Sequence, residues 1–487
     1  MGLPAISYRN FLNEAGVTAT ARTQNSTYPA SNILRPNVTH LYRSDSKCVV
    51  LNGTTKYFWI DDDAWNSYTG DFCFEFLYRP DTTDTSDTNK PIIDKWGVAG
   101  QRAYMVAHRN AHIRVFLSSN GTDAAAQVTF AAVLTAAQYD RSKLSYKAAT
   151  RDLVLYVDGV ESGRVIDTTA TGTASITGAV PTSLHNGTTR LTIGADSAGA
   201  NLIAGKLGFI GFDNAPSDNG GYLYSGTCDA YYKFDSSDGT DSSGNGRTLT
   251  AVSLSSGDYS NCTAYHWVGI AMSSALAPTW LMIDRRHNLS TGATVRVLNG
   301  SWFSSYSSKG YKASVTAGEA IVLTLTTGGS AAQWLEINDP ANPDGYIEIP
   351  HVWMGHRQNL AGSYGDEGGY LRRAVVAGRG AMSTILTRVG SRIGPVLYEF
   401  ELPWKFKDAD RAIWEAAMAY AATDPMVLVL DRDNPDNAAY LVDWLGVHLG
   451  SMQGRGELVL RKRTDGGDDS LSETTMTFSE CGAGVDQ

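Results

Sequence analysis

The sequence predicts a mainly β protein with two β-sandwich regions and a small C-terminal α+β module. Short apolar runs with a period of two recur about every ten residues, separated by turns rich in Gly, Asn and Asp. The chain contains 49 glycines, which suit a fold with many turns. A helical period stands out only in residues 408–425, near the C-terminus.

Length and composition narrow the class of protein. The chain has 487 residues, which suggests about three domains, and its 43% hydrophobic and 18% charged residues indicate a globular protein. A net charge of −10 disfavours a general nucleic-acid-binding protein. No apolar run approaches the roughly 18 residues of a membrane span, and the N-terminus lacks the pattern of a secretory signal. We therefore expect neither nucleic-acid partners nor membrane insertion.

The first sandwich region begins near residue 48. Residues 48–60 predict a hairpin with an Asn-Gly turn at 52–53, and residues 71–80 alternate as a strand. Residues 151–165 predict a second hairpin with an Asp-Gly turn at its tip. This series of short strands is typical of a β-sandwich.

The second sandwich region resumes at 263 and reaches 355, where the chain contains a firmly specified corner. Two prolines fix φ, and an Asp-Gly pair then permits the reversal into the next strand. We expect a rigid structural turn, with a calcium site as the alternative, because carboxylate and carbonyl oxygens are present but few. The turn residues are Asp339, Pro340, Asn342, Pro343, Asp344 and Gly345.

The C-terminal part changes period. Residues 356–379 are Gly-rich and polar, which predicts a linker, and residues 380–487 form the expected α+β module. Within it, 396–406 alternates as a strand, and 408–425 predicts a helix that begins at Asp408 and ends at a proline.

Residues 48–213 resemble laminin-G/concanavalin-A-like jelly rolls through the ordered set LNGTTKYFWI, DFCFEFLYRP, PIIDKWG, LVLYVDGVESG and LTIGAD. In that family this order of motifs builds two packed antiparallel sheets. The segment DAYYKFDSSDGTDSSGNG is similar to an opening strand of such domains but comes at the end. Either the strand order is permuted, or the segment is a return strand.

The flanking parts resemble tail-associated virion proteins of bacteriophages. The carrying motifs are IDRRHNLSTGATVRVLNGSW and QWLEINDPANPDGYIEIPHVWMG, which in that group build a galactose-binding-like (discoidin-type) sandwich. The opening ATARTQNSTYPASNIL is similar to the first strands of the same sandwich. The resemblance implies a sandwich split into 1–47 and 263–355, with a jelly roll inserted at 48–262, and an assembly role for 380–487.

The chain has five cysteines and no CxxC motif, a pattern that disfavours a zinc site. Cys48 and Cys262 fall at the two ends of the expected insert, so both should lie near the joint. A disulfide between them is the alternative to two buried thiols.

No metal ion or other cofactor is expected, with calcium as the alternative on the rim of the jelly roll. Candidate carboxylates for such a rim are Asp94, Asp158, Asp196 and Asp213. The run Asp61, Asp62 and Asp63 predicts an exposed turn after a strand, with a metal site as the alternative.

Three aromatic residues, Trp65, Tyr68 and Trp96, fall in expected loops or near strand ends. Exposed aromatic rings there suit stacking on sugar rings, so these are the candidate carbohydrate-binding residues, with burial in the core as the alternative. His287 and Asn288 follow an expected strand, and the resemblance makes them structural hydrogen-bonding residues at its end.

No catalytic residue is predicted, because the sequence contains no GxSxG, HExxH or GxxxxGK[ST] motif. The resemblance implies a non-enzymatic structural component of a phage tail tip or baseplate. It would be made in the bacterial cytoplasm, be located in the virion and contact other tail proteins in a symmetric assembly. Its jelly roll would project outward and bind a host-surface glycan. The alternatives are a virion-associated glycan hydrolase acting through the jelly-roll cleft and a free-standing lectin.

Overall fold

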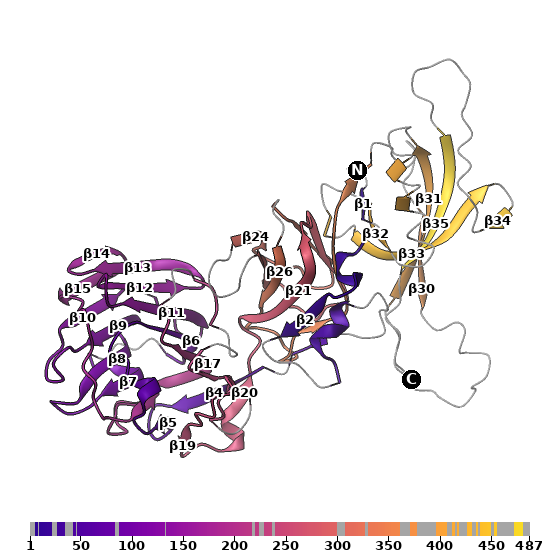
Figure 1. Ribbon diagram of the computed structural model, residues 1–487. Coiled ribbons are helices and arrows are strands. Elements are labelled where there is room, and N and C mark those ends of the chain that lie inside the picture. Colours follow the sequence, from indigo (N-terminus) through magenta and orange to yellow (C-terminus); the bar gives the residue numbers. More distant parts are fainter. Residues whose placement is uncertain are drawn as a thin grey trace. The chain divides into compact units, whose positions relative to one another are not determined.

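The computed structural model has a mainly β architecture of antiparallel sheets, as the sequence predicts (Figure 1). No helix in the part of the chain that the structure describes is long and apolar enough to cross a membrane. The described residues are 5–7, 9–21, 27–34, 42–44, 46–82, 87–131, 133–216, 220–223, 228–235, 239–299, 307–326, 330–360, 371–376, 396–406, 412–413, 416–417, 426–430, 435–436, 439–449, 452–454 and 472–480.

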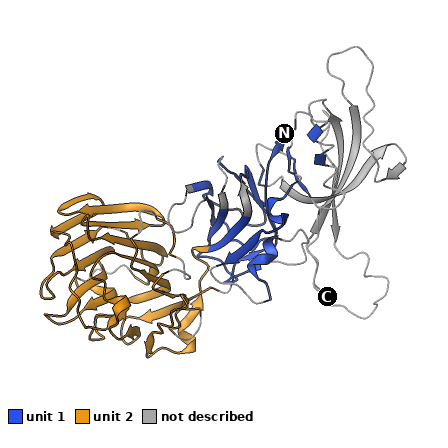
Figure 2. Ribbon diagram, viewed as in Figure 1, with its two compact units in different colours: residues 1–44, 267–299, 308–487 blue, residues 45–266, 300–307 orange. Residues whose placement is uncertain are grey.

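The chain divides into two compact units (Figure 2). One unit, here called the guest sandwich, comprises residues 45–266 together with 300–307. The other, here called the frame, comprises residues 1–44, 267–299 and 308–487. Apart from the short segment 300–307, the boundaries between the two units fall at 44/45 and 266/267, and the joints expected from the sequence are 47/48 and 262/263.

The guest sandwich consists of two large sheets. The first sheet has the strand order β15 (Ala174–Gly178), β10 (Ala126–Phe130), β9 (His112–Leu117), β8 (Arg102–Arg109), β7 (Lys90–Trp96), β16 (Leu191–Ile193), β5 (Tyr57–Ile60) and β19 (Thr250–Val252). The second has the order β14 (Thr169–Gly172), β13 (Val160–Ile166), β12 (Asp152–Val157), β11 (Asp140–Lys147), β6 (Phe72–Pro80), β17 (Ala204–Asp213), β4 (Lys47–Asn52) and β20 (Tyr259–Asn261). The short helices η3 (Ala64–Asn66) and η4 (Ser256–Asp258) belong to connecting loops.

Strand pairing corrects one expectation and supports another. The predicted hairpin at 48–60 does not form, because β4 belongs to the second sheet and β5 to the first. The Asp-Gly turn does join β12 to β13, with φ of 52° at Asp158 and 83° at Gly159, both in the left-handed region that this hairpin turn requires.

The late segment that resembles an opening strand contains β18 (Ala230–Tyr232). It pairs with residues 210–212 of β17, whereas β4 pairs with residues 204–207 of the same strand. The two short strands therefore divide one side of β17 between them. The segment completes the second sheet next to the first strand of the guest sandwich.

In the frame, the first sheet has the strand order β2 (Thr18–Ala21), β21 (His266–Leu276), β26 (Ser330–Asn338), β23 (Thr294–Asn299) and β24 (Ser307–Lys312). A second has the order β25 (Ile321–Thr324), β22 (Trp280–Ile283) and β28 (Val352–Gly355), and β27 (Glu348–Ile349) pairs with β3 (Tyr42–Arg43). The helices η1 (Phe11–Asn13) and η2 (Ala30–Leu34) lie in the N-terminal segment.

The two separated pieces of the frame form one hydrophobic core. Ile33 and Tyr42 from the N-terminal piece are fully buried in the same cluster as Val268, Val295 and Ile349 from the later piece. Strand β2 also pairs with β21 over residues 268–271. The N-terminal piece and the later piece therefore build one sandwich, although the guest separates them in the sequence.

The C-terminal sheet also uses the N-terminus. Its order is β29 (Gln358–Asn359), β1 (Ala5–Ser7), β32 (Met426–Val429), β33 (Ala439–Leu449), β35 (Ser472–Glu480), β31 (Val396–Phe406) and β30 (Leu371–Val376), with β34 (Met452–Gly454) on β33. The expected linker 356–379 thus contributes two strands. Of the expected helix 408–425, residues 412–413 and 416–417 are helical, and the remainder lies outside the described residues.

The cysteines at the joint are close but not bonded. Cys48, Cys73, Cys228 and Cys262 are free thiols, and Cys481 lies outside the described residues. Cys48 pairs in register with Ser260 of β20. Cys262, which directly follows β20, is therefore its diagonal neighbour. Diagonal neighbours are about 7–8 Å apart, which is wide for a disulfide. A hydrogen bond with the Cys262 thiol lowers the pKa of Cys48 to about 6 against the effect of burial.

Candidate functional site on the guest sandwich

The register of the first sheet aligns one row of side chains across all eight strands. Paired residues in an antiparallel sheet project from the same face. The adjacent row contains Val115, Val106, Ile93 and Ile193, which are buried in the core between the sheets. The aligned row therefore lies on the opposite, outer face, and its members are Thr177, Gln127, Phe116, Met105, Asp94, Thr192, Trp59 and Thr250.

This outer face contains an apolar centre. Met105 and Phe116 are nearly buried, at 7% and 8% exposure, although they lie on the side of the sheet away from the core. Trp96 packs against them, with its ring centroid 5.9 Å from that of Phe116. Trp59, farther along the row, is partly exposed, as is Trp96. Aromatic side chains are thus available where this sheet faces outward.

Two arginines lie over these indole rings. The Arg102 guanidinium is 5.6 Å from the Trp96 ring centroid, and the Arg190 guanidinium is 5.2 Å from that of Trp59. Such stacking holds a guanidinium in place while leaving its N–H edges open to other partners. Arg114, on β9, projects from the same face and donates from Nε to Thr129 Oγ1 at 3.2 Å.

The polar centre of the row is unusual for an outer face. Asp94 is 1% exposed and accepts hydrogen bonds from the backbone N–H groups of Trp96 and Ser197. Burial raises the pKa of Asp94 to about 8, and the nearby Asp196 carboxylate adds to the shift. Beside it, Thr192 is fully buried, and its hydroxyl has no hydrogen-bond partner among the described residues.

Two predicted stacking residues occupy other positions. Trp65 and Tyr68 are 8% and 5% exposed and belong to the core between the sheets. The exposure expected of them from their loop positions is not found. Their segment folds inward at the short helix η3, whose start is capped by the Asp63 carboxylate. Of the three predicted residues, Trp96 alone lies on the outer face.

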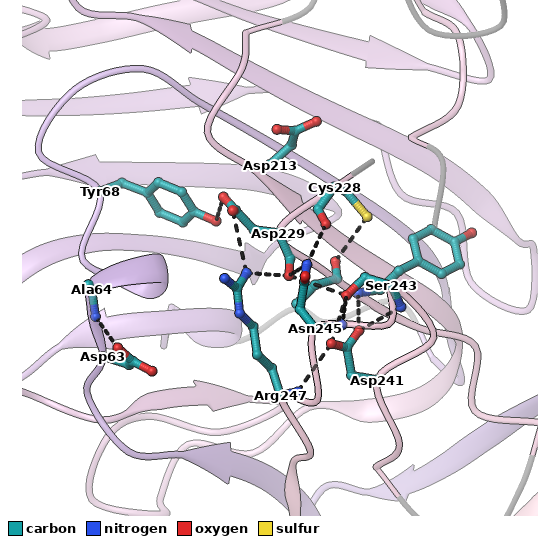
Figure 3. A network of polar contacts seen from close by, with 12 residues as sticks. Asp63, Ala64, Tyr68, Asp213, Cys228, Asp229, Asp241, Ser243, Asn245 and Arg247 are labelled. Carbon is teal, nitrogen blue, oxygen red and sulfur yellow. Dashed lines mark hydrogen bonds and ion pairs between the residues drawn. The ribbon is translucent and has the colours of Figure 1, made fainter. Parts of the chain in front are cut away.

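A polar network extends from the Tyr68 hydroxyl through Asp229 to Arg247 (Figure 3). The Tyr68 hydroxyl donates to Asp229 Oδ2 at 3.2 Å. Arg247 donates to the backbone oxygen of Asp229 and lies over the Trp65 ring at 4.9 Å. These contacts attach the loop that follows β18 to the end of the sandwich.

Asp241 organises the same loop from within (Figure 3). Its carboxylate accepts from the backbone N–H groups of Tyr231 at 3.0 Å and Ser243 at 2.8 Å, and from the Ser243 hydroxyl at 2.7 Å. It also accepts from the backbone N–H of Arg247 at 3.2 Å. Because these oxygens already accept several hydrogen bonds, we assign the network a structural role.

In the frame, the corner and the strand-end residues bond to each other. The Asp339 carboxylate, 1% exposed, accepts from the Ser290 backbone at 2.9 Å and from Asn342 Nδ2 at 2.9 Å. Asn288 Nδ2 donates to Asp344 Oδ2 at 3.0 Å, and its Oδ1 accepts from the Glu348 backbone at 2.7 Å.

The remaining corner contacts are also local. His287 Nδ1 accepts from the Leu289 backbone at 3.1 Å, and its Nε2 lies 3.0 Å from Glu319 O. Asn342 Oδ1 accepts from the Asp344 backbone at 2.9 Å, and Gly345 has a φ of 73°. All of these contacts hold the turn in place.

The candidate calcium ligands do not gather. Among the described residues, no group of three or more His, Cys, Asp or Glu side chains is placed to hold a metal ion. Asp62 instead pairs with the buried Lys95 at 2.5 Å, and Asp63 caps η3. Asp158 accepts from the Arg141 backbone at 3.0 Å.

Comparison with known proteins gives only distant likenesses. No family model matches the chain, and no curated protein matches it. A Bacteroides ovatus protein assigned as a carbohydrate binding protein has a TM-score of 0.32 at 15% identity, covering 43% of this chain and 60% of its own. The CBM40 of Ruminococcus gnavus IT-sialidase, bound to α2,3-sialyllactose, has 0.26 at 11% identity, covering 36% and 94%. A pentraxin from Limulus polyphemus has 0.23 at 7%, covering 35% and 77%.

These TM-scores are too low to support any argument about function. This chain spans only 60% of the length of the Bacteroides protein. The phage tail assignment depends on the sequence resemblance alone.

Sequence reasoning missed most of the outer face. Trp59, Phe116 and the three arginines were not predicted as site residues, because their common face depends on which strands pair. The only local signal is alternation within strands. In residues 57–60, for example, it separates the core residue Phe58 from Trp59.

Proposed function

We propose that this protein is a non-enzymatic structural component of a phage tail tip or baseplate whose guest sandwich binds a host-surface glycan. The observation that carries the glycan-binding part is the outer face of the first sheet, where Trp59 and Trp96 lie beneath arginines. Aromatic faces stack on the apolar faces of sugar rings, and polar side chains around them accept or donate to hydroxyl groups. We name this outer face, with its three arginines Arg102, Arg114 and Arg190, the arginine face.

The assembly part of the proposal is supported by the sequence resemblance and by the construction of the frame. Strand β1 lies between β29 and β32, so the N-terminus, the sandwich and the C-terminal sheet form one continuous frame. Such a frame suits permanent contact with neighbouring tail subunits, which would bury thousands of Å². Mass spectrometry of purified virions of the phage that encodes the chain tests this part. Absence of the protein from the virions would contradict it.

Glycan binding is tested with the full chain on an array that contains acidic and neutral polysaccharides. We expect Trp59→Ala and Trp96→Ala each to weaken binding by about tenfold or more, which is about 1.4 kcal/mol. The matched control is Tyr311→Ala, because Tyr311 is an aromatic residue of the frame that is 52% exposed. Equal loss in the control, or no loss in either tryptophan variant, would contradict the assignment of the face.

The absence of catalysis is part of the proposal and has its own test. Any polysaccharide bound in the array is incubated with the protein, and new reducing ends are measured over time. We expect none. Steady release of reducing ends would favour the alternative, a virion-associated glycan hydrolase that uses two carboxyl groups.

A further inference from the structure

The arginines of the guest sandwich fall into two groups. Six of the nine have a carboxylate partner within 4.0 Å, and these are Arg79, Arg109, Arg141, Arg151, Arg164 and Arg247. Arg102, Arg114 and Arg190 have no carboxylate partner among the described residues. All three belong to the arginine face. In a chain with a net charge of −10, this face keeps its positive charge.

Their hydrogen bonds leave most of each guanidinium open. Arg190 donates from Nε to Ser197 O at 3.1 Å, and Arg114 donates from Nε to Thr129 Oγ1 at 3.2 Å. Arg102 donates through NH1 to a backbone oxygen, and its buried Nε has no partner in the described part of the chain. A guanidinium has five N–H donors, so each of these arginines retains donors for an anion.

Among the described residues, no carboxylate near this face forms an ion pair with Arg102, Arg114 or Arg190. Asp94 lies in the same row, but burial raises its pKa to about 8, which favours the neutral acid at pH 7. Asp196 accepts hydrogen bonds from its own loop, at Ala198 N and Ala200 N. Asp87 is paired with Arg109 at 2.9 Å.

The spacing of the arginines fits a chain rather than a single small anion. Arg114 is on β9 and Arg190 precedes β16, with β8 and β7 between them. Neighbouring strands are about 4.8 Å apart, so these two strands are separated by roughly 14 Å. Arg102, at the start of β8, lies between them in strand order. Several sugar rings of an extended polymer can span this distance.

We infer that the arginine face binds an acidic polysaccharide, with sugar carboxylates paired to Arg102, Arg114 and Arg190 and sugar rings packed against the parts of Trp59 and Trp96 that the arginines leave exposed. This inference rests on the proposed glycan-binding function and names the chemical class of the glycan. Bidentate pairing between guanidinium and carboxylate gives the selectivity for acidic sugars. The stacked tryptophans also bind neutral rings, but they do not distinguish the acid from its reduced form.

The test compares each acidic polymer with its own neutral derivative. Full-length protein is titrated calorimetrically with hyaluronan, alginate and polysialic acid, and with the carboxyl-reduced form of each. We expect at least one acidic polymer to bind, and its carboxyl-reduced form to bind at least about tenfold more weakly. Binding should also weaken as salt concentration rises, because charges at a surface are screened.

Variants of the three arginines test whether the acidic polymer binds at the arginine face. Arg102→Gln, Arg114→Gln and Arg190→Gln should each weaken binding of the acidic polymer by about tenfold, and the triple variant by more than a hundredfold. Arg164→Gln is the matched control, because it removes the same charge from the second sheet. Circular dichroism checks that all variants remain folded.

The possible outcomes separate the inference from the function on which it depends. Equal binding of an acidic polymer and its reduced form, lost in Trp59→Ala but not in the arginine variants, would overturn the inference and leave glycan binding in place. The same conclusion follows if only neutral polymers bind. No binding by any acidic or neutral polymer would count against both.

Discussion

The frame and the guest sandwich both place arginines over aromatic rings, but they complete the arrangement differently. In the frame, Arg296 lies 5.1 Å from the Tyr311 ring centroid and also 3.6 Å from Glu336. In the guest, Arg102 and Arg190 lie over tryptophans with no carboxylate partner in the described part of the chain, whereas Arg247 lies over Trp65 and pairs with Asp229. The same local contact is therefore electrically neutral at Arg296 and Arg247 and positively charged at Arg102 and Arg190.

This difference shows how a binding surface can be distinguished from a structural one. In the frame, the polar side chains of the corner at 339–345 bond to each other and to backbone groups, which holds the turn in shape. On the arginine face, donors remain open. A ligand that pairs with these arginines would use donors that the fold itself leaves open.

The largest expected effect comes from breaking the core of the guest. Phe74 is fully buried, and its ring centroid is 4.2 Å from that of Phe72. Phe74→Ala should lower the free energy of unfolding of the guest by about 3–5 kcal/mol, because it removes buried apolar surface and leaves a cavity. Urea denaturation measures the loss. Val160→Ala, at a position that is 66% exposed, is the control, and a loss below about 1 kcal/mol in Phe74→Ala would contradict the assigned core.

A smaller loss is expected from the frame corner. Asn288→Ala removes the donor to Asp344 and Tyr346 O and the acceptor for the Glu348 backbone, with distances between 2.7 and 3.0 Å. We expect a loss of about 2–3 kcal/mol, since buried backbone groups lose their partners. Asn214→Ala, at an exposed position in the guest, provides the comparison and should change little. If both variants unfold at the same urea concentration as the parent, the corner does not stabilise the frame.

The raised pKa of Asp94 predicts that the free energy of unfolding of the guest sandwich depends on pH. The pKa of an unfolded Asp is about 3.9, whereas burial raises the pKa of Asp94 to about 8. Between these values the folded state keeps a proton that the unfolded state has lost. Its contribution to the free energy of unfolding therefore falls as pH rises, by about 1.4 kcal/mol per pH unit.

Asp94→Asn removes this dependence, because the amide does not titrate. The variant should match the parent near pH 4 and become relatively more stable as the pH rises toward 8. Urea denaturation at a series of pH values measures the difference between the two proteins. The pKa of Asp140, which burial also raises to about 7, affects both proteins alike. A difference that stays constant with pH would show that Asp94 titrates normally.

The smallest effect is expected from an exposed ion pair of the frame. Arg9 and Glu14 pair at 2.5 Å, with side-chain exposures of 48% and 32%. Arg9→Gln should change the free energy of unfolding by less than about 1 kcal/mol, because solvent screens the pair. Thermal melts at low and high salt test this. A large loss at both salt concentrations would place Arg9 in a role beyond this pair.

Strands and turns could be predicted from the sequence wherever a few neighbouring residues determine them. Alternation identified the strands around 71–80 and 151–165, and the Asp-Gly pair identified the turn between β12 and β13. The Asn-Gly pair at 52–53 predicted a hairpin that does not form, because the two strands that it joins pair in different sheets. A turn signal specifies a change of direction but not the partner of the next strand.

The residue sequence by itself determined the mainly β class, the turn-rich strands and the acidic charge, because these depend on composition and on residues close together in the chain. Tertiary structure alone decided that Trp65 and Tyr68 are buried and that residues 358–359 and 371–376 are strands. It also decided that Trp59 and Trp96 share one face with three arginines that have no carboxylate partner among the described residues. The physical reason is that strand pairing joins segments far apart in sequence, and only that pairing determines which side chains become neighbours.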